Sequence, residues 1–577
     1  MKRYWKYIKP YLSAFILAPI LMIVEVLGEI FLPKLMSLII NNGVEDRNIG
    51  YITTVGIVMI ITAVLMALGG IGGAYFGAKA SINFAADLRK DAFDSVQKFS
   101  FKNIDDFSTG SLVTRLTNDV TQVQNLINML LRMALRAPGM MIGAIIMAFS
   151  INAELAVIII IVMPILIAVI ALVITKAFPK FQILQTKIDK LNSIIRENVT
   201  NVRVIKSFVR GDLEKEKFAE ANNDLKNSSL DAFRIMIIAM PAMSLAMNIT
   251  TLAVVWFGGK QIVAGQMPVG DLTAFITYVT QILMSLMMTS MLILQSSRAI
   301  VSGRRINEII DCKPDITDDA AKYPERLVGS GSVEFKNVSF SYYKNSEEKV
   351  LSDINMKIES GDVVGIIGST GSGKTTLVSM IARLYDPDEG EVLVDGVNVK
   401  DYSLYNLREA VSMVLQKNVL FSGSIMENLR WGYAEATEDE VRNVAKMAQA
   451  DGFVSEFKEG YEMDLGQGGV NVSGGQKQRL CIARALLKKP KILVLDDSTS
   501  AVDTATEANI RKNLKEYCPD TTKIVIAQRI SSVIEADKIF VLDDGRIVGH
   551  GTHSELMSSC EAYQEIYYSQ MDKEVNA

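Results

Sequence analysis

Long apolar stretches without a single charged residue dominate the first 300 positions of the chain, and none of comparable length follows them. These stretches are 17 to 31 residues long and cover 48–78, 137–153, 155–175, 235–259 and 272–297. Because a helix that crosses a membrane needs about 20 predominantly apolar residues, each stretch predicts one span. A further apolar run, 11–32, is interrupted by Glu25 and Glu29. The pattern therefore predicts a six-span helical membrane half followed by a water-soluble half.

The predicted domain boundaries follow the same change of pattern. A transmembrane domain is expected over 1–310, a polar linker over 311–331 and a water-soluble domain over 332–577. The spans are expected near 11–36, 50–78, 129–151, 154–177, 235–259 and 271–297. Between them, the loops 79–128 and 176–234 are rich in Lys and Arg, as is the N-terminal segment. Since such loops stay in the cytoplasm, both termini are expected on the cytoplasmic side of a multi-pass protein of the inner membrane.

The two long inner loops contain extended stretches free of Pro and Gly, so the adjoining helices can continue into them. About 50 helical residues at 1.5 Å each form a rod of roughly 75 Å, whereas the hydrocarbon core is about 30 Å thick. We therefore expect long cytoplasmic helical extensions. They either remain solvated hairpins or act as levers that reach the soluble domain.

Composition narrows the possible functions. The chain is 49% apolar and 21% charged, which excludes a disordered chain. Its net charge of −4 gives no sign of a nucleic-acid partner, since no basic excess is present. Four cysteines are scattered without metal-ligand spacing, and only two histidines occur, both after residue 549.

A glycine-rich loop in the soluble half predicts a phosphate-binding site. The segment 365–376 reads GIIGSTGSGKTT and follows a Val/Ile strand, which satisfies G-x-x-x-x-G-K-[ST]. Backbone amides of such a loop surround phosphate oxygens, and Lys374 is expected to neutralise the β and γ phosphates. Thr375 is expected to help hold Mg²⁺. Farther along, ILVLDD (492–497) predicts a buried strand that ends at Asp496, a second group for the metal ion.

Together with that loop, NVSGGQKQR (471–479) resembles the ATP-binding cassette (ABC) superfamily, through its signature VSGGQ. Six spans before one cassette resemble a half-size ABC exporter, and the resemblance covers nearly the whole chain. It implies that the water-soluble domain, 332–577, is a nucleotide-binding domain of the α/β P-loop ATPase (ABC ATPase) type, which binds ATP and Mg²⁺. It also implies a head-to-tail dimer, in which the P-loop of one chain and the signature of the other hold each nucleotide.

The resemblance assigns roles to individual residues. Tyr342 matches the aromatic residue that stacks on adenine, although it is also an ordinary strand tyrosine. Gln416 matches the Q-loop glutamine that contacts Mg²⁺, beside Thr375 and Asp496. SAVD (500–503) matches the D-loop between two cassettes. The expected nucleotide contacts are Tyr342, Gly368, Ser369, Thr370, Gly371, Ser372, Gly373, Lys374, Thr375, Thr376, Asp496, Val472, Ser473, Gly474, Gly475, Gln476 and Asp503.

Two expected catalytic positions depart from the family pattern. The family usually has Glu after the strand aspartate, where it polarises the attacking water, but this chain has Asp497. Its carboxylate is withdrawn by about an ångström, which can cost on the order of 10²-fold in rate. The family's switch histidine is replaced by Gln528, which cannot become cationic. GQGG (466–469) also replaces the usual G-E-R-G.

These departures resemble the degenerate-site subunit of a heterodimeric exporter. The intact signature would complete the site of a second chain that carries Glu and His at the catalytic positions. A homodimer with slow hydrolysis and a nucleotide-sensing regulatory subunit are the alternatives. In each case Asp497, Gln528 and Gln416 are the residues expected to control hydrolysis.

The spans also bear on the exported compound, and the resemblance implies multidrug or lipid export. Glu25 and Glu29 lie on one helix face beyond the middle of the first span. They are expected to meet cationic substrates, to pair with Lys34, Arg132, Arg136 or a partner chain, or to reach the lipid headgroups at the helix end. Methionines line the last two spans and suit an apolar cavity, although packing or lipid contact is the more common reason for such residues. Of these, Met240, Met243 and Met247 are substrate candidates.

Overall fold

The protein divides into two compact units in the computed structural model, which describes residues 2–342, 348–497 and 502–575. The first unit comprises Met1–Gln97 and Gly110–Asp311, and the second comprises Lys98–Thr109 and Cys312–Ala577. A short segment from the first half of the sequence therefore belongs to the second unit. It contains helix α4 (Phe101–Asp106).

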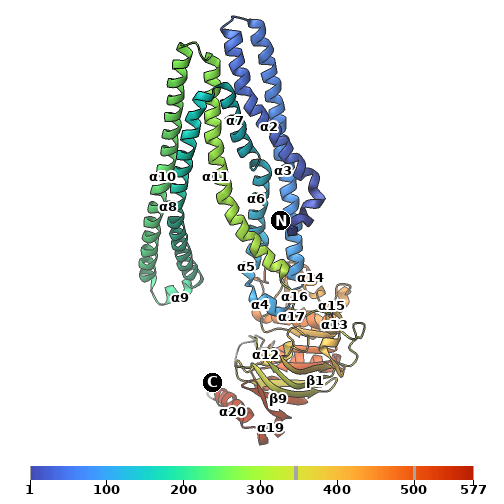
Figure 1. The fold of residues 1–577 in the computed structure, drawn as a ribbon. Coiled ribbons are helices and arrows are strands. Elements are labelled where there is room, and N and C mark those ends of the chain that lie inside the picture. The colour runs from blue at the N-terminus through green and yellow to red at the C-terminus, as the bar shows by residue number, and fades with distance from the viewer. Residues whose placement is uncertain (1, 343–347, 498–501, 576–577) are drawn as a thin grey trace. The chain divides into compact units, whose positions relative to one another are not determined.

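The first unit consists of helices (Figure 1). They are α1 (Trp5–Ile8), α2 (Leu12–Leu38), α3 (Ile49–Gln97), α5 (Thr109–Thr114), α6 (Val120–Met133), α7 (Arg136–Ile151), α8 (Ala153–Thr200), α9 (Val202–Ser207), α10 (Gly211–Val263) and α11 (Val269–Asp311). Short 3₁₀ turns at Lys2–Tyr4 and Lys9–Tyr11 flank α1. Wider π-helical turns cover Ile39–Val44 and Arg115–Asp119.

Helices α2 and α3 pack closely because α3 presents glycines to its neighbour. Gly69, Gly73 and Gly77 are buried at four-residue spacing on one face of α3. A methyl group at Gly69 would lie 2.9 Å from the backbone oxygen of Leu21 on α2. Larger side chains at that position would push the two helices apart, and small residues allow such close backbone approach within membranes.

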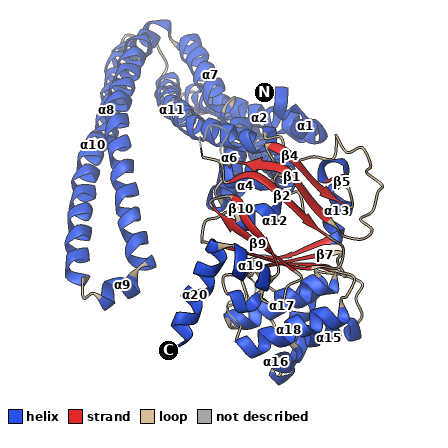
Figure 2. Cartoon of the chain, turned by 90° about the horizontal axis from the view of Figure 1, so that it is seen from below, coloured by secondary structure: helices blue, strands red, loops and turns tan. Residues whose placement is uncertain are grey.

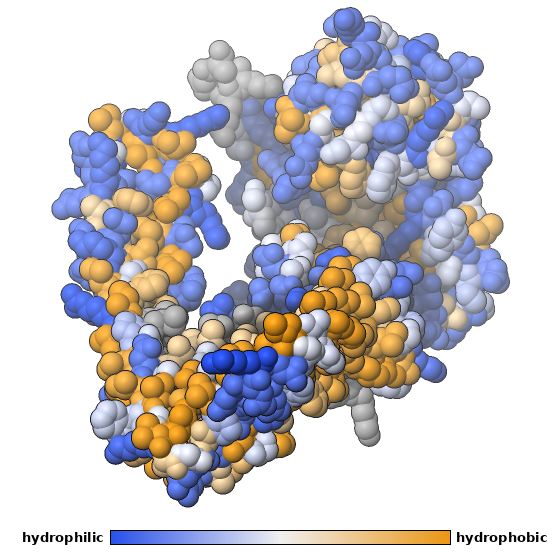
Figure 3. Space-filling model, turned by 90° about the horizontal axis from the view of Figure 1, so that it is seen from above, coloured by the Kyte–Doolittle hydropathy of each residue, from blue (hydrophilic) through white to orange (hydrophobic). Residues whose placement is uncertain are grey.

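Five helical segments in the described ranges are long and apolar enough to cross a membrane. They are Trp5–Val44, Ile49–Gln97, Thr109–Ile151, Ala153–Thr200 and Val269–Thr289. The remaining predicted span, 235–259, lies within the continuous helix α10, several of whose side chains fall outside the described residues. Large apolar side chains such as Ile71 and Leu172 are exposed on these helices, and Figure 3 shows apolar surface gathered over them.

The second unit is built on two sheets (Figure 2). A four-stranded sheet has the order β2-β1-β4-β5, and a six-stranded sheet has the order β10-β9-β3-β8-β7-β6. In the larger sheet, β9, β3, β8, β7 and β6 run parallel, and β10 pairs antiparallel with β9. The strands are β1 (Val333–Phe340), β2 (Leu351–Ile358), β3 (Val363–Gly368), β4 (Glu389–Val394), β5 (Val397–Asn398), β6 (Val411–Val414), β7 (Ile492–Asp496), β8 (Thr522–Ile526), β9 (Lys538–Asp543) and β10 (Arg546–Gly551).

Alternate side chains of the parallel strands enter two separate hydrophobic cores. In β7, Leu493 and Leu495 belong to one core, whereas Ile492 and Val494 belong to the other. Parallel sheets are typically buried on both faces in this way. The helices are α12 (Lys374–Ser379), α13 (Leu404–Ala410), α14 (Ile425–Arg430), α15 (Glu438–Met447), α16 (Asp451–Glu456), α17 (Gly474–Leu487), α18 (Thr504–Tyr517), α19 (His553–Ser559) and α20 (Glu561–Val575), with 3₁₀ turns at Val399–Asp401, Gly460–Glu462 and Ile530–Ser532.

Candidate functional site

The glycine-rich loop connects β3 to α12, as its sequence predicts. Gly368 and Gly373 have positive φ angles, and added methyl groups would lie 1.9 Å from the backbone oxygen of Leu542 and 2.9 Å from that of Val350, respectively. Only glycine fits these positions without displacing backbone. The Lys374 ammonium donates to the carbonyl oxygens of Gly368 (2.9 Å) and Ser369 (2.7 Å). The loop thus folds around the ammonium group of Lys374.

A buried carboxylate lies beside this loop. Asp496 ends β7 and is 2% exposed, and its Oδ2 accepts a hydrogen bond of 2.8 Å from the hydroxyl of Thr375. The structure therefore brings together the two groups that the sequence assigns to Mg²⁺. Their oxygens are the hard ligands that this ion prefers.

The next residue, Asp497, meets both glutamines of the predicted catalytic set. Its Oδ2 accepts from Nε2 of Gln528 (2.8 Å) and from Nε2 of Gln416 (3.2 Å). Its backbone N–H donates to the oxygen of Ile526 in β8 (2.9 Å), and its φ of 47° is left-handed. Asp497, Gln416 and Gln528 thus form one hydrogen-bonded cluster at the carboxyl ends of parallel strands, where α/β proteins place ligand-binding groups.

Burial governs the ionisation of these groups. Burial raises the pKa of Asp497, against the hydrogen bond from Gln416, the charge of Lys374 and the hydrogen bond from Gln528. Burial likewise raises the pKa of Asp496, against the hydrogen bond from Thr375. Conversely, burial lowers the pKa of Lys374, although both aspartates oppose this shift. The site therefore contains two partly desolvated acids that a cation would stabilise.

The signature segment forms the start of a helix. Ser473 precedes α17, where its hydroxyl accepts from the N–H of Gln476 (3.3 Å) and its own N–H donates to the Gln476 side chain (2.9 Å). This capping box leaves the two glycines as the first residues of the helix. Val472, just before it, is buried. The glycines expose backbone amides without side chains, an arrangement that allows a phosphate to approach closely.

Other predicted nucleotide contacts are also described. Tyr342 is exposed after β1, and its hydroxyl lies 2.9 Å from that of Thr376, so the structure joins the predicted adenine contact to the P-loop helix. Asp503 caps α18 by accepting from the N–H of Thr506 (2.9 Å). The preceding D-loop positions Ser500 and Ala501 lie outside the described residues.

An aromatic cluster that the sequence did not predict connects Tyr342 to helix α4. The Tyr385 ring lies 5.3 Å from that of Tyr342 and 6.1 Å from that of Phe101 on α4. The Tyr385 hydroxyl also donates to Oδ2 of Asp105 on α4 (2.8 Å). Tyr385 lies in no recognised motif, and only the fold reveals that it links the two segments.

The two acidic residues of the first span pair with one arginine. Arg136 on α7 lies 3.1 Å from the Glu25 carboxylate and 2.7 Å from that of Glu29. Lys34 pairs instead with Asp271, at 3.3 Å. This arrangement favours the ion-pair interpretation of the glutamates. Among the candidate methionines, Met247 packs against the core around α7, α8 and α11, whereas the side chains of Met240 and Met243 lie outside the described residues.

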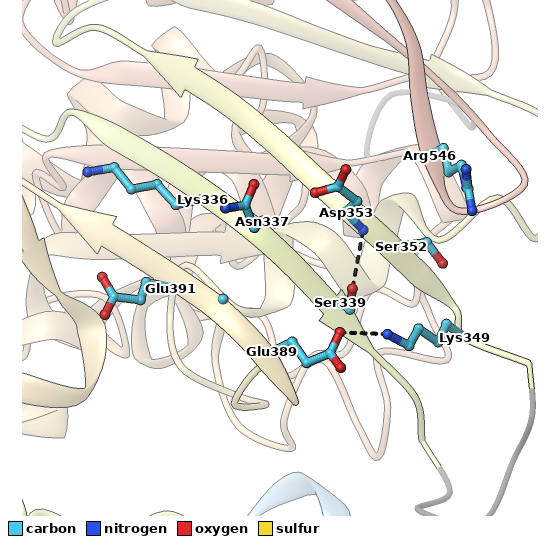
Figure 4. A pocket seen from close by; sticks show the side chains of 10 residues that line it. Lys336, Asn337, Ser339, Lys349, Ser352, Asp353, Glu389, Glu391 and Arg546 are labelled. Atoms are coloured by element: carbon cyan, nitrogen blue, oxygen red, sulfur yellow. Dashed lines mark hydrogen bonds and ion pairs between the residues drawn. The ribbon is translucent and has the colours of Figure 1, made fainter.

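A separate hollow lies on the smaller sheet, away from these motifs (Figure 4). Its volume is about 780 Å³, and its lining mixes acidic and basic side chains from β1, β2, β4 and β10. Lys349 and Glu389 pair across it at 2.6 Å. None of the predicted site residues is among those that line this hollow.

Comparisons with known proteins agree with this arrangement. The family described as "ABC transporter transmembrane region" matches residues 15–286, and the family "ABC transporter" matches residues 351–500. The ABC transporter ATP-binding protein YfiB of Bacillus subtilis (strain 168) is 39% identical over 574 residues, which cover 100% of this chain and 99% of that protein. An ABC transporter ATP-binding protein of Mycobacterium tuberculosis (strain H37Rv) is 38% identical, covering 98% of this chain and 97% of that protein.

A solved structure shares the fold as well. It is described as "Structure of a bacterial Atm1-family ABC exporter with ATP bound" and matches with a TM-score of 0.78 and 25% identity, covering 98% of each chain. The membrane helices, the P-loop, the buried strand aspartate and the signature helix thus occur together in one chain, over the full length of its relatives. The chain belongs to the ABC transporter superfamily and is a half-size ABC exporter.

Proposed function

We propose that the chain is one subunit of a dimeric exporter that uses ATP to move hydrophobic or amphipathic compounds out across the cytoplasmic membrane. Both termini would lie in the cytoplasm. Its nucleotide would lie between its own P-loop and the signature of the second chain, while its own VSGGQ segment would complete the partner's site. Mg²⁺, bound with ATP beside Thr375, Asp496 and Gln416, would neutralise phosphate charge.

We further propose that this chain's own site is degenerate. This proposal rests on the hydrogen bonds of Asp497, whose Oδ2 accepts from the side-chain amides of both Gln528 and Gln416. A general base must lie within hydrogen-bond reach of the water that it activates. Here the carboxylate is short and two amides already hold its oxygen. The amide of Gln528 also lacks the positive charge that a histidine can carry toward a γ-phosphate.

The partner would then be a different half-transporter with Glu and His at these positions. In this scheme ATP binding at both sites closes the two cassettes, and hydrolysis at the partner's site reopens them. The alternative is a homodimer with slow hydrolysis. The raised pKa of Asp497 supports it, because burial makes this carboxylate a stronger proton acceptor.

Two features of the membrane unit bear on the substrate class. A partly buried triad of two glutamates and one arginine carries one excess negative charge, which suits a cationic compound. Met247 offers a flexible apolar contact. Most of the charge in this triad is neutralised by the two ion pairs with Arg136. We therefore regard hydrophobic character as the main criterion and positive charge as an added preference.

Transport of a fluorescent dye into inside-out membrane vesicles tests the exporter function. Vesicles containing this chain and its partner should accumulate a hydrophobic cationic dye when ATP and Mg²⁺ are added. Vesicles with Lys374→Ala in this chain should accumulate less, because the phosphate-binding cation is removed. Accumulation that does not depend on ATP, or no accumulation of any tested hydrophobic dye, would contradict the proposal.

A further inference from the structure

The C-terminal helix holds the segment that carries Gln528. The side-chain amide of Gln570 on α20 donates from Nε2 to the backbone oxygen of Gln528 (2.7 Å) and accepts at Oε1 from the backbone N–H of Ile530 (2.9 Å). One side chain thus forms two hydrogen bonds, one on each side of Arg529. Such a two-point contact fixes the direction of the peptide chain as well as its position.

The helix that presents Gln570 is itself anchored. Tyr563, near the start of α20, is fully buried in the core of the second unit, and its hydroxyl lies 2.8 Å from Nδ1 of His553 on α19. Ile566 and Tyr567 pack against the same core. Gln570 lies one helical turn after these residues, so the helix that presents its amide to the Gln528 segment is held in place by the core.

The contact ends at the candidate catalytic cluster. While Gln570 holds the backbone of Gln528, the Gln528 side chain donates to Asp497 (2.8 Å). Backbone contact on one side and side-chain contact on the other leave Gln528 little freedom to change its direction. A displacement of about 1 Å at such a position is enough to weaken a directed polar contact severely.

We propose that Gln570 is a positioning residue for the nucleotide site, through which the C-terminal helix sets where the Gln528 amide lies. This inference rests on the proposed nucleotide site, and it adds that the Gln528 amide, in the place of the family's switch histidine, reaches the γ-phosphate when ATP is bound. Gln528 then distinguishes ATP from ADP, because only ATP carries that phosphate. Gln570 controls this discrimination without touching the nucleotide.

The test measures equilibrium binding of ATP and of ADP to the full-length chain in lipid nanodiscs, with Mg²⁺ omitted to prevent hydrolysis. Gln528→Ala should lower the preference for ATP over ADP by about tenfold, the usual effect of a lost hydrogen bond to a charged group. Gln570→Ala should lower it by about threefold or more and leave ADP binding unchanged. Gln570→Glu should act similarly, because it sets an oxygen against the Gln528 carbonyl.

Gln564→Ala is the matched control, since Gln564 lies on the same helix but donates to the oxygen of Met557 (2.8 Å). It should leave both affinities unchanged. Gln570→Ala added to Gln528→Ala should have no further effect on the ATP preference, since both changes act on one contact.

Different results separate the two proposals. If Gln528→Ala lowers the ATP preference but both Gln570 variants retain it, the positioning role is wrong and the role of Gln528 stands. Equal weakening of ATP and ADP by Gln570→Ala would also overturn the positioning role, since it indicates general loss of structure. An unchanged preference in Gln528→Ala would overturn the γ-phosphate contact itself and the inference with it.

Discussion

Lengthening the Asp497 side chain should increase ATP hydrolysis at this chain's own site. Asp497→Glu adds one methylene group, which moves the carboxylate outward by about 1 Å. The amides of Gln528 and Gln416 now hold the Asp497 oxygen at 2.8 and 3.2 Å. The longer side chain can keep one of these contacts while an oxygen reaches the position where water would attack.

The expected gain follows from that displacement. A displacement of about 1 Å in the position of a reacting group can lower the rate on the order of 10²-fold. A carboxylate that extends far enough to contact the attacking water should therefore raise the turnover rate by about 10- to 100-fold. This corresponds to about 1.4–2.7 kcal/mol of activation free energy. Asp497→Glu combined with Gln528→His should reach the upper end, since a histidine can also donate to the γ-phosphate as a cation.

The assay is phosphate release by the chain purified alone in nanodiscs at saturating Mg²⁺ and ATP. Asp439→Glu is the matched control, because it makes the same chemical change at an exposed position on α15. Lys374→Ala added to the activated variant should abolish the gain. If both activated variants bind ATP but hydrolyse it at a rate within twofold of wild type, the short side chain of Asp497 is not what limits hydrolysis.

Three further predictions concern the groups around the site and in the membrane unit. Tyr385→Phe removes the hydrogen bond to Asp105 on α4. In this variant the slowing of backbone hydrogen exchange that ATP causes in 98–109 should be reduced by roughly threefold or more. Tyr405→Phe, at an exposed position, should leave that slowing unchanged. Arg136→Ala leaves two carboxylates unpaired and should destabilise the protein in thermal unfolding by about 3 kcal/mol, part of which Glu29→Gln restores; an unchanged midpoint would contradict the triad. Because burial raises the pKa of Asp496, the folded state binds this proton more tightly, so the stability that this group contributes falls as pH rises above its ordinary pKa. Asp496→Asn should therefore raise the nucleotide-free melting temperature more at pH 7.5 than at pH 4, and an equal shift would contradict the burial argument.

The P-loop could be predicted from the sequence because its chemistry is local. Gly368, Gly373 and Lys374 lie within seven positions, and the need for glycine follows from the close approach of backbone. The pairing of Asp496 with Thr375 required only the rule that α/β sheets collect ligands at the carboxyl ends of strands. The structure places both groups accordingly.

Other features depend on residues that are distant in the sequence. Arg136 was one of several possible partners for Glu25, and helix packing alone selects it. The sequence predicts that 101–106 belong to a cytoplasmic loop of the membrane half, but these residues form α4, which belongs to the second unit and contacts Tyr385. Gln570 follows the last motif by more than 40 residues and has no sequence signal, since a surface glutamine on a helix is common.

The central claim is that this chain binds ATP but hydrolyses it slowly at its own site. The most direct measurement is the ATPase rate of the chain purified alone and of the chain co-expressed with the product of a neighbouring open reading frame. We predict activity only with the partner, and we predict that it survives Asp497→Ala in this chain. Rapid hydrolysis by the chain alone, abolished by Asp497→Ala, would contradict the claim and establish Asp497 as the catalytic base of a homodimer.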